Sequence, residues 1–204
     1  MPNKSVGESK KQGALDHCEH TGRPAYIEVG VTLTQMRPTG LVNVRVRPDN
    51  LAVESIRNKL GCDLPTVPGT VESSSDCHIL WIGPTEWLVT MSSCEGSVAS
   101  EVLSAALAEF HAAVNDVSDS LHIIRVSGED ARLVLEKGCS LDLHQREFRP
   151  GRCARSVIAK ATVLLHQTDD APSFELYVDR SYAEYLWRWL EDAASTLVGV
   201  KRQE

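Results

Sequence analysis

Two stretches of this sequence follow one plan: VRVRPDNLAVESIRNKLGCDL at residues 44–64 and IRVSGEDARLVLEKGCSLDL at residues 124–143. Each begins with alternating apolar and polar residues, which is the period of a half-buried strand. A turn signal follows, and then apolar residues recur at helical spacing. Gly61 and Gly138 are expected to end the two helices, and each is followed by a cysteine. The repeat predicts a strand–helix unit that occurs twice.

The segments that follow the two stretches also correspond. After each helix the sequence predicts a hairpin of two strands and then another helix. The strands are expected at 77–83, 86–91, 160–168 and 173–179, and the helices at 98–113 and 181–198. The order strand, helix, strand, strand, helix therefore occurs twice. It predicts an α+β fold of two ferredoxin-like (split βαβ) halves with antiparallel sheets.

The chain length fits this arrangement, because 204 residues can form two small halves that pack together. Residues 1–24 are polar and are expected to form an extended arm. The first half is expected at 25–116, although residues 26–39 carry only a weak strand pattern. The second half is expected at 117–204, and the two halves at 25–204 are expected to form one compact unit.

The composition argues against several classes of partner. Apolar residues make up 42% of the chain and the net charge is −7, so there is no basic excess of the kind that binds nucleic acid. No apolar run has signal-peptide length, and none approaches the roughly 20 residues of a membrane span. A cytoplasmic location without a membrane partner is expected.

The six cysteines are scattered and form no Cys-x-x-Cys pair. They are expected to be free thiols in a reducing compartment, several of them buried as small apolar groups. The segment HCEH (17–20) has metal-binding residue types, but no second cluster has a fitting spacing. A solvated tail is therefore the favoured interpretation of this segment.

The tryptophans are candidates for a core or for a contact surface. In ILWIGPTEWLV (79–89), Trp81 and Trp87 flank a Gly-Pro turn, and alternation places Trp81 on the face opposite Leu80 and Ile82. Three interpretations stay open for these rings: a core, a subunit contact, or a site for a flat ligand. The core is favoured, because a buried Trp removes roughly 150–250 Å² from water.

Two further tryptophans lie on the last predicted helix. Trp187 and Trp189 are two residues apart, so they cannot share one helix face. One of them is expected to be half exposed, and an exposed large aromatic indicates a contact surface. Trp81, Trp187 and Trp189 are therefore interface candidates.

A run of arginines is the strongest charged feature of this acidic chain. Arg146, Arg149, Arg152 and Arg155 recur at intervals of three, but Pro150-Gly151 prevents one continuous helix. Guanidinium groups bind carboxylates and phosphates with fork geometry. The run is either a solvated loop or a docking site for an acidic partner or for an anionic cofactor tail held by that partner.

No catalytic motif is present: there is no GxGxxG, P-loop, GxSxG or HExxH. The cluster at 116–120 contains hydroxyls and carboxylates that more often satisfy backbone groups. Cys139 precedes Asp142 and His144, but the same Gly-Cys pair recurs in the other half without a histidine, which favours a structural role. The chain is expected to have no catalytic, cofactor-binding or metal site of its own.

The stretches WIGPTEWLV (81–89), NDVSDSLHIIRVSGEDARLVLEKGCSLDLH (115–144) and FRPGRCARSVIAKATVLLHQTDDAPSFELYVDRSYAEYLWRWLEDA (148–193) carry a resemblance. Through them, residues 40–195 resemble the family of gamma subunits of heterotetrameric bacterial sarcosine oxidases. These subunits are in turn similar to part of the folate-binding aminomethyltransferases (T-proteins). That similarity implies two ferredoxin-like halves, in agreement with the repeat.

The resemblance also implies a function. Such complexes contain alpha, beta, gamma and delta chains and oxidise sarcosine to glycine with O₂, forming hydrogen peroxide. With tetrahydrofolate they form methylene-tetrahydrofolate. FAD, covalent FMN and NAD are expected in the alpha and beta chains, and zinc in the delta chain. The leading hypothesis is a noncatalytic gamma subunit that braces the flavin-bearing chains.

One departure bears on folate. Folate-using relatives carry a Gly-Gly-apolar-x-Asp-Asp stretch, whereas the corresponding segment 160–165 reads KATVLL, without a carboxylate. The resemblance therefore implies a retained fold and a lost folate site. Two alternatives stay open. One is a free-standing folate-binding or aminomethyltransferase-like protein, and the other is a metal-binding adaptor that uses residues 17–20.

Overall fold

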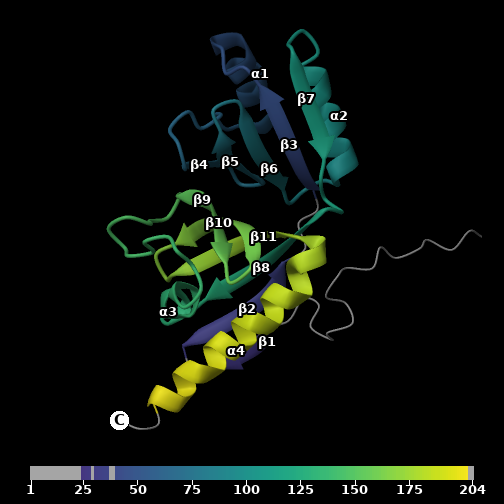
Figure 1. Ribbon diagram of the computed structural model, residues 1–204. Coiled ribbons are helices and arrows are strands. Elements are labelled where there is room, and N and C mark those ends of the chain that lie inside the picture. Colours follow the sequence, from purple (N-terminus) through teal and green to yellow (C-terminus); the bar gives the residue numbers. More distant parts are fainter. Residues whose placement is uncertain (1–23, 29, 37–39, 202–204) are drawn as a thin grey trace, which may run out of the picture.

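The structure is a computed structural model that describes residues 24–28, 30–36 and 40–201 (Figure 1). Eleven strands, four α-helices and one short 3₁₀ helix occupy these ranges. The elements before residue 117 are β1 (Pro24–Glu28), β2 (Val31–Met36), β3 (Gly40–Val46), α1 (Asn50–Leu60), β4 (Val71–Ser73), β5 (Cys77–Gly83), β6 (Glu86–Met91), α2 (Gly96–Ala106) and β7 (Ala112–Asp116). The remaining ones are β8 (Leu121–Ser127), α3 (Ala131–Glu136), β9 (Cys153–Ile158), β10 (Ala161–Asp169), β11 (Ser173–Asp179), η2 (Arg180–Tyr182) and α4 (Ala183–Lys201). The predicted arm at 1–24, Pro24 excepted, and the HCEH segment lie outside the described residues.

The five-stranded sheet has the predicted ferredoxin-like topology. Its order is β4-β5-β6-β3-β7, and every neighbouring pair is antiparallel. Strand β6 lies between β3 and β5, which are joined by α1, and this is the split βαβ arrangement. Strand β4 adds an outer edge.

The six-stranded sheet repeats this plan with one difference. Its order is β1-β2-β8-β11-β10-β9, so β11 lies between β8 and β10 as β6 lies between β3 and β5. The place beside β8 that corresponds to β7 is taken by β2, from the other end of the chain. The second half contributes β8, β9, β10 and β11, but none of them lies on the outer side of β8, so β2 of the first hairpin fills that position.

This topology differs from the predicted boundary of the first half. That half was expected to begin at residue 25, but β1 and β2 pair in the sheet of the second half.

A second difference concerns the helix predicted at 98–113. Helix α2 ends at Ala106, and residues 112–116 form β7 against β3. The apolar residues beyond Ala106 fit both a helical and a strand period, and the vacant edge of β3 decides between them.

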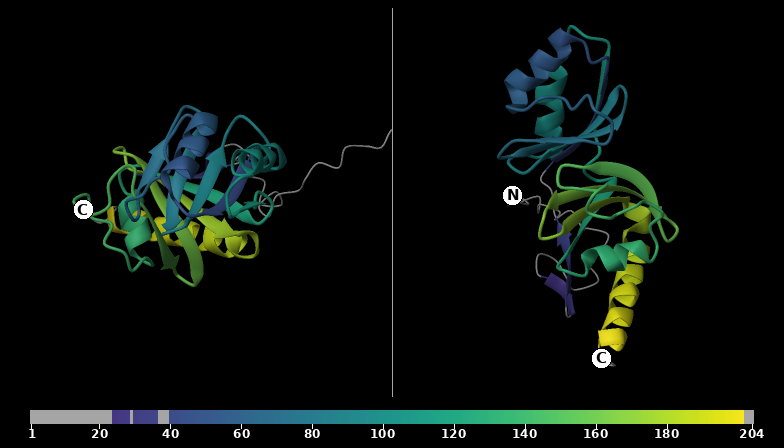
Figure 2. Two further views of the ribbon diagram at one scale, coloured as in Figure 1. Left: turned by 90° about the horizontal axis from the view of Figure 1, so that it is seen from above. Right: turned by 90° about the vertical axis from the view of Figure 1, so that its left-hand side faces the viewer.

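The elements stack in four layers. Helices α1 and α2 cover one face of the five-stranded sheet, the second sheet packs on its other face, and α3 and α4 cover the far side (Figures 1 and 2). Strand alternation sorts the side chains as predicted. Trp87 and Val89 face α1 and α2, whereas Leu80 and Leu88 face the other sheet. We call the space between the two sheets the seam.

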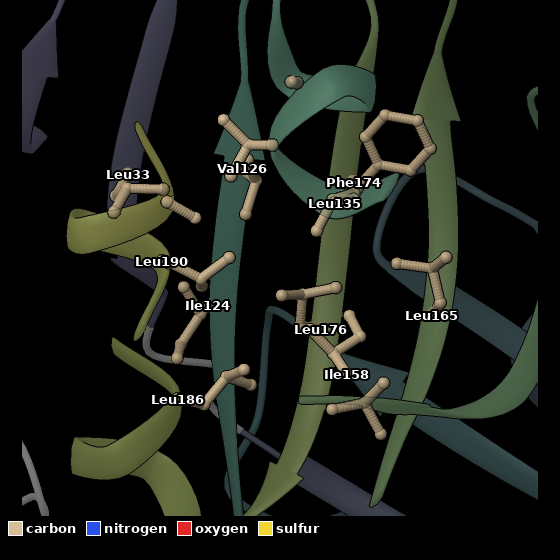
Figure 3. Packing of buried hydrophobic residues seen from close by; sticks show 14 of the residues in the cluster. Leu33, Ile124, Val126, Leu135, Ile158, Leu165, Phe174, Leu176, Leu186 and Leu190 are labelled. Atoms are coloured by element: carbon tan, nitrogen blue, oxygen red, sulfur yellow. The ribbon is translucent and has the colours of Figure 1, made fainter. Parts of the chain in front are cut away.

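The largest core lies between the six-stranded sheet and its helices. Leu186 and Leu190 of α4 lie against Leu33, Ile124 and neighbouring strand residues, all of them fully buried (Figure 3). Complete burial of one such side chain stabilises the fold by about 1.5–3 kcal/mol. The C-terminal helix is therefore fixed both to the first hairpin and to strands of the second half.

The two glycines of the repeat have different roles. Gly61 has φ 71° and its N–H donates to the Arg57 carbonyl, so it ends α1 as predicted. Helix α3 ends earlier, at Glu136, and Gly138 is not among the glycines with positive φ. A Cβ at Gly138 would lie 2.5 Å from Cζ2 of Trp189 and 3.1 Å from the Ala159 nitrogen. Gly138 is needed for close packing under the indole ring.

Changing Gly138→Ala is expected to lower the free energy of unfolding by about 1–3 kcal/mol, because the new methyl group overpacks against the ring. Adding Trp189→Leu should relieve part of this cost, and the two changes should couple in a double-mutant cycle followed by denaturant unfolding. Gly61→Ala is the control: its Cβ meets no atom within 4 Å, so its backbone penalty should not depend on residue 189. Purely additive effects of the changes at 138 and 189 would contradict this packing role.

Candidate functional site

A cluster of charged and polar side chains lies in the seam. Glu175 of β11 is only 6% exposed, and strand register places Arg125 of β8 on one side of it and His166 of β10 on the other. Its carboxylate accepts hydrogen bonds from Arg125 Nη2 at 2.6 Å and from the Tyr177 hydroxyl at 2.8 Å. His166 Nδ1 lies 3.8 Å from Oε2 of Glu175. The carboxylate is thus held by two hydrogen bonds, and the imidazole of His166 lies at a longer distance on its other side.

The second sheet wall contributes His78, whose ring centroid is 5.6 Å from that of His166 in an edge-on arrangement. Its Nδ1 lies 2.7 Å from the Ser73 hydroxyl on the adjacent strand β4. Burial, followed by the neighbouring His166, lowers the pKa of His78. The polar cluster therefore extends across both sheets and favours a neutral imidazole at His78.

The environment of Glu175 strongly favours its charged form. Burial alone opposes ionisation, but His166, Arg125 and Tyr177 together outweigh it and lower the pKa of Glu175 from 4.5 to about 2. Burial, together with the nearby Glu175 carboxylate, raises the pKa of Tyr177 well above its usual value. Tyr177 therefore acts as a fixed donor and Glu175 as a fixed acceptor, which is a structural arrangement and not that of an acid–base pair poised near neutral pH.

Two cavities open from the seam, and Tyr177 lines both. The smaller has a volume of about 370 Å³ and is bordered by His78, Arg125 and Glu175. The larger has a volume of about 600 Å³, with Leu88 and Leu164 among its apolar residues. Its polar residues are Asn43, Asn115, Ser120, Arg155, Thr162, Tyr177 and Asp179.

The four arginines of the predicted run are separated by the fold. Arg146 and Arg149 are exposed in the loop before β9, and Arg152 is half-buried beside Gly69. Arg155 lies on β9 and lines the larger cavity. Arg132 fixes the conformation of this loop, because its guanidinium donates hydrogen bonds to the backbone carbonyls of Leu143 and Phe148.

The tryptophans lie mainly within this chain's own cores. Trp87 is fully buried, and its indole N–H donates to the Pro65 carbonyl at 2.9 Å. Trp187 is 2% exposed and lies in the core under α4, so this ring does not present an open contact surface. Trp81 and Trp189 are half-buried against the two helix-covered cores. An interface role remains a prediction for the exposed edges of these last two rings.

The other residues weighed for chemistry take structural positions. The Cys139 thiol lies 3.6 Å from the Ser156 hydroxyl, while Asp142 accepts from the backbone N–H of His144. Ser118 binds the Leu41 backbone at 2.9 Å, as expected for a residue that satisfies main-chain groups.

Within residues 24–28, 30–36 and 40–201, no three His, Cys, Asp or Glu side chains gather as metal ligands would. In the same ranges no helix has the length and apolar character needed to cross a bilayer.

The seam cluster was missed by sequence reasoning. Its signal lies in the strands LLHQ and FELY, where His166 and Glu175 interrupt otherwise apolar runs at positions that register brings side by side. A charged residue within a buried strand needs a partner on a neighbouring strand. Only the strand order identifies that partner as Arg125.

Comparison with known proteins places this geometry in a family. The family described as sarcosine oxidase, gamma subunit (SoxG) matches residues 47–196. This chain belongs to the sarcosine oxidase gamma subunit family. A relative in that family, the sarcosine oxidase subunit gamma of Corynebacterium sp. (strain U-96), is 31% identical over 169 residues, which is 82% of this chain and 81% of the relative.

Solved structures agree with this membership of the gamma subunit family. A chain of the heterotetrameric sarcosine oxidase from Corynebacterium sp. U-96, in complex with pyrrole 2-carboxylate, superposes with a TM-score of 0.81 at 28% identity. The match covers 91% of this chain and 95% of that one. The glycine cleavage system aminomethyltransferase T from Bartonella henselae shares the fold, with a TM-score of 0.61 at 14% identity. There the match covers 87% of this chain and 48% of the aminomethyltransferase. The predicted resemblance and the α+β, aminomethyltransferase-like fold are confirmed.

Glu175 should make stability depend on pH in acid. Its folded-state pKa lies below the unfolded value, so its contribution is complete above about pH 4.5 and is lost as pH falls toward 2. The difference in pKa corresponds to roughly 3 kcal/mol. Glu175→Gln is therefore expected to lower the free energy of unfolding at pH 7, with a gap to the wild type that narrows between pH 4.5 and pH 2.

The matched control is Glu184→Gln. Glu184 pairs with Arg188 on the surface of α4, and exposed ion pairs contribute little to stability. Urea unfolding at a series of pH values should show almost no pH-dependent gap for this variant. If the difference in the free energy of unfolding between the wild type and Glu175→Gln stayed constant from pH 4.5 to pH 2, Glu175 would not carry the charge assigned to it.

Proposed function

We propose that this chain is the noncatalytic gamma subunit of a cytoplasmic heterotetrameric sarcosine oxidase, with alpha, beta and delta chains as its partners. The observation that carries the proposal is the near-complete match, covering 95% of a chain in such a heterotetramer. The 31% identity to an independently named gamma subunit, spread over most of both sequences, supports the same assignment.

In this proposal the complex oxidises sarcosine with O₂ to glycine and hydrogen peroxide, and tetrahydrofolate accepts the one-carbon unit. FAD, FMN, NAD, tetrahydrofolate and zinc are held by the partner chains. The role of this chain is to support assembly. The arrangement of the seam is consistent with that role, because Arg125 and Tyr177 already satisfy the Glu175 carboxylate. A rigid seam fixes the two sheets relative to each other and presents a constant outer surface to partners.

The arginine loop is the proposed contact for an acidic partner surface. Arg146 and Arg149 are exposed, while Arg132 binds the backbone of the same loop from inside. The loop is therefore preorganised, which reduces the entropy lost on binding. Val67 is 58% exposed and lies close to this loop, because residues 69–71 form backbone hydrogen bonds with residues 151–153 where the two halves meet. Basic groups beside an apolar residue fit a partner surface with carboxylates around an apolar centre.

A tagged chain purified from its native host tests the assignment. It should bring down three further polypeptides, and the purified assembly should show flavin absorbance and sarcosine-dependent oxygen consumption. The same chain expressed alone should show neither property. Sarcosine oxidation by the lone chain would end the noncatalytic proposal, and micromolar binding of tetrahydrofolate to it in equilibrium dialysis would favour the free-standing folate-binding alternative.

The loop makes a separate prediction. The double change Arg146→Glu, Arg149→Glu is expected to reduce co-purification of the partner chains at least tenfold, because repulsion replaces attraction at the contact. Circular dichroism should be unchanged, since both side chains are exposed. The control changes Arg47 and Arg188, which are exposed on other surfaces, to Glu, and alters net charge by the same amount. Equal losses in both variants, or none in either, would show that the loop is ordinary solvated surface.

A further inference from the structure

Two histidines from opposite sheets meet in the seam. His78 of β5 shares a strand face with Leu80, His166 of β10 shares one with Leu164, and both leucines belong to the apolar cluster of the seam. The two imidazole rings lie edge-on, with their centroids 5.6 Å apart. The pair is therefore a direct contact between the two sheets, and each of its members is able to take up a proton.

The buried carboxylate beside this pair is already engaged. Glu175 accepts hydrogen bonds from Arg125 at 2.6 Å and from the Tyr177 hydroxyl at 2.8 Å. It is the neighbour of His166 in the strand register, and His166 Nδ1 lies 3.8 Å from its Oε2. His78 stands on the other sheet. A proton on His78 would therefore bring a positive charge toward Arg125 and His166 without a carboxylate of its own.

The other groups that face the pair do not neutralise such a charge. They are Ser73 of β4, Thr90 of β6, Cys153 of β9, Tyr177 of β11 and Asp76 before β5. The Ser73 hydroxyl lies 2.7 Å from His78 Nδ1 and fixes the ring. Burial raises the pKa of Cys153 to about 11 and that of Tyr177 well above its usual value, so both stay uncharged. Asp76 is exposed, and water screens its charge.

We propose that the His78–His166 contact makes the seam sensitive to pH. In mild acid, protonation of His78 loosens the contact between the two sheets, while each sheet stays packed against its own helices. The inference does not depend on the proposed function.

The direction of the effect follows from where the proton binds more readily. Burial, followed by the neighbouring His166, lowers the pKa of His78 below its usual value of 6.5. The closed seam thus binds this proton less readily than the opened one, and the contribution of the contact is complete above about pH 6.5 and is lost as pH falls below it. Glu175, with a pKa of about 2, keeps its charge throughout the range from pH 6.5 to 4.5. His78 borders the smaller cavity and is only half-buried, so a proton reaches it from solvent.

The seam is also the contact that opens most readily. It contains the smallest of the three apolar clusters in the described part of the chain, and the clusters under α1 and α2 and under α3 and α4 hold far more buried side chains. Hydrophobic stabilisation grows with the apolar area removed from water. A charge on His78 therefore acts on the weakest of the three contacts and leaves both helix-covered cores in place.

Cys153 is a natural reporter of the seam. It is 2% exposed, pairs with His166 in the strand register, and its sulfur lies 3.3 Å and 3.5 Å from the carbonyl oxygens of Trp81 and Thr70 in the first half. Cys77 provides the internal reference, because it is 3% exposed in the core under α1 and α2. All five cysteines of the described ranges are free thiols, so both are available for labelling.

The test labels the full-length chain with a pyridyl disulfide, which also reacts with thiols in acid, and locates the label by peptide mapping. Between about pH 7 and about pH 5, labelling of Cys153 in the wild type is expected to accelerate about tenfold relative to Cys77, because the rate follows the population of the open seam. His78→Asn, whose amide can still bind Ser73 but takes up no proton, should lose most of this acceleration. Wild type and variant are compared at the same pH, so that the ionisation of the thiol itself cancels.

The matched control is His111→Asn, which removes an exposed histidine outside the seam and should behave as the wild type does. Equal acceleration in the wild type and in His78→Asn would overturn the proposal. Equal acceleration of Cys153 and Cys77 in the wild type would overturn it as well, because the whole chain would then be unfolding. If His78→Asn fails to fold, His166→Gln takes its place: it removes the neighbouring ring and should also reduce the acceleration, and the wild-type ratio of the two labelling rates decides independently of either variant.

Discussion

The pairing of β2 with β8 is the constraint on which the rest of the structure depends. Without it, the second sheet would end at β8, and the backbone groups of that strand would be unpaired beside a large apolar core. Leu33 of β2 also completes that core, against Ile124 and the leucines of α4. One antiparallel pair thus satisfies the hydrogen bonds of the sheet and fills the space beneath α4. This pairing also sets the path of the chain, which begins in the six-stranded sheet with β1 and β2, forms the five-stranded sheet with β3 to β7, and then returns to the six-stranded sheet at β8.

This double crossing brings the sheets face to face and creates the seam. The apolar part of the seam comes from Leu41, Leu80, Leu88 and their counterparts in the other sheet. The charged part is grouped around Glu175, where attractive interactions outweigh the cost of burial. Such a cluster specifies the register of β8 on β11, because a shift of one residue would separate the carboxylate from Arg125. In a subunit whose proposed task is assembly, this fixed alignment determines the surface presented to neighbouring chains.

Much of the fold could be predicted from local patterns. The repeat of strand, helix and hairpin follows from apolar periodicity, and Gly61 ends its helix as its position indicated. What local patterns could not give was the partner of each edge strand. The segment at 24–36 shows that it forms strands but not which sheet it joins, and α2 ends early because β3 had a free edge for residues 112–116. The candidate site was likewise only partly predictable, because local patterns do not show which residues the fold brings together. Arginines at regular intervals look like one patch, yet a bend and a strand send Arg155 to a cavity while Arg149 stays in a loop. Trp187 was expected to be available to a partner, but it lies in the core. The spacing of Trp187 and Trp189 shows that they lie on different faces of the helix, but it does not show which face packs against the sheet.

The origin of β2 also has a consequence for synthesis of the chain. The ribosome releases the first hairpin long before β8 exists, so its inner edge must wait through translation of the entire first half. During this delay the nascent chain exposes an unpaired strand edge, a state that invites pairing with other chains. The first half can close its own sheet meanwhile, since β3 to β7 are contiguous. Maturation is thus ordered in time: strands β3 to β7 can pair first, and the first hairpin is secured only after β8 has been synthesised.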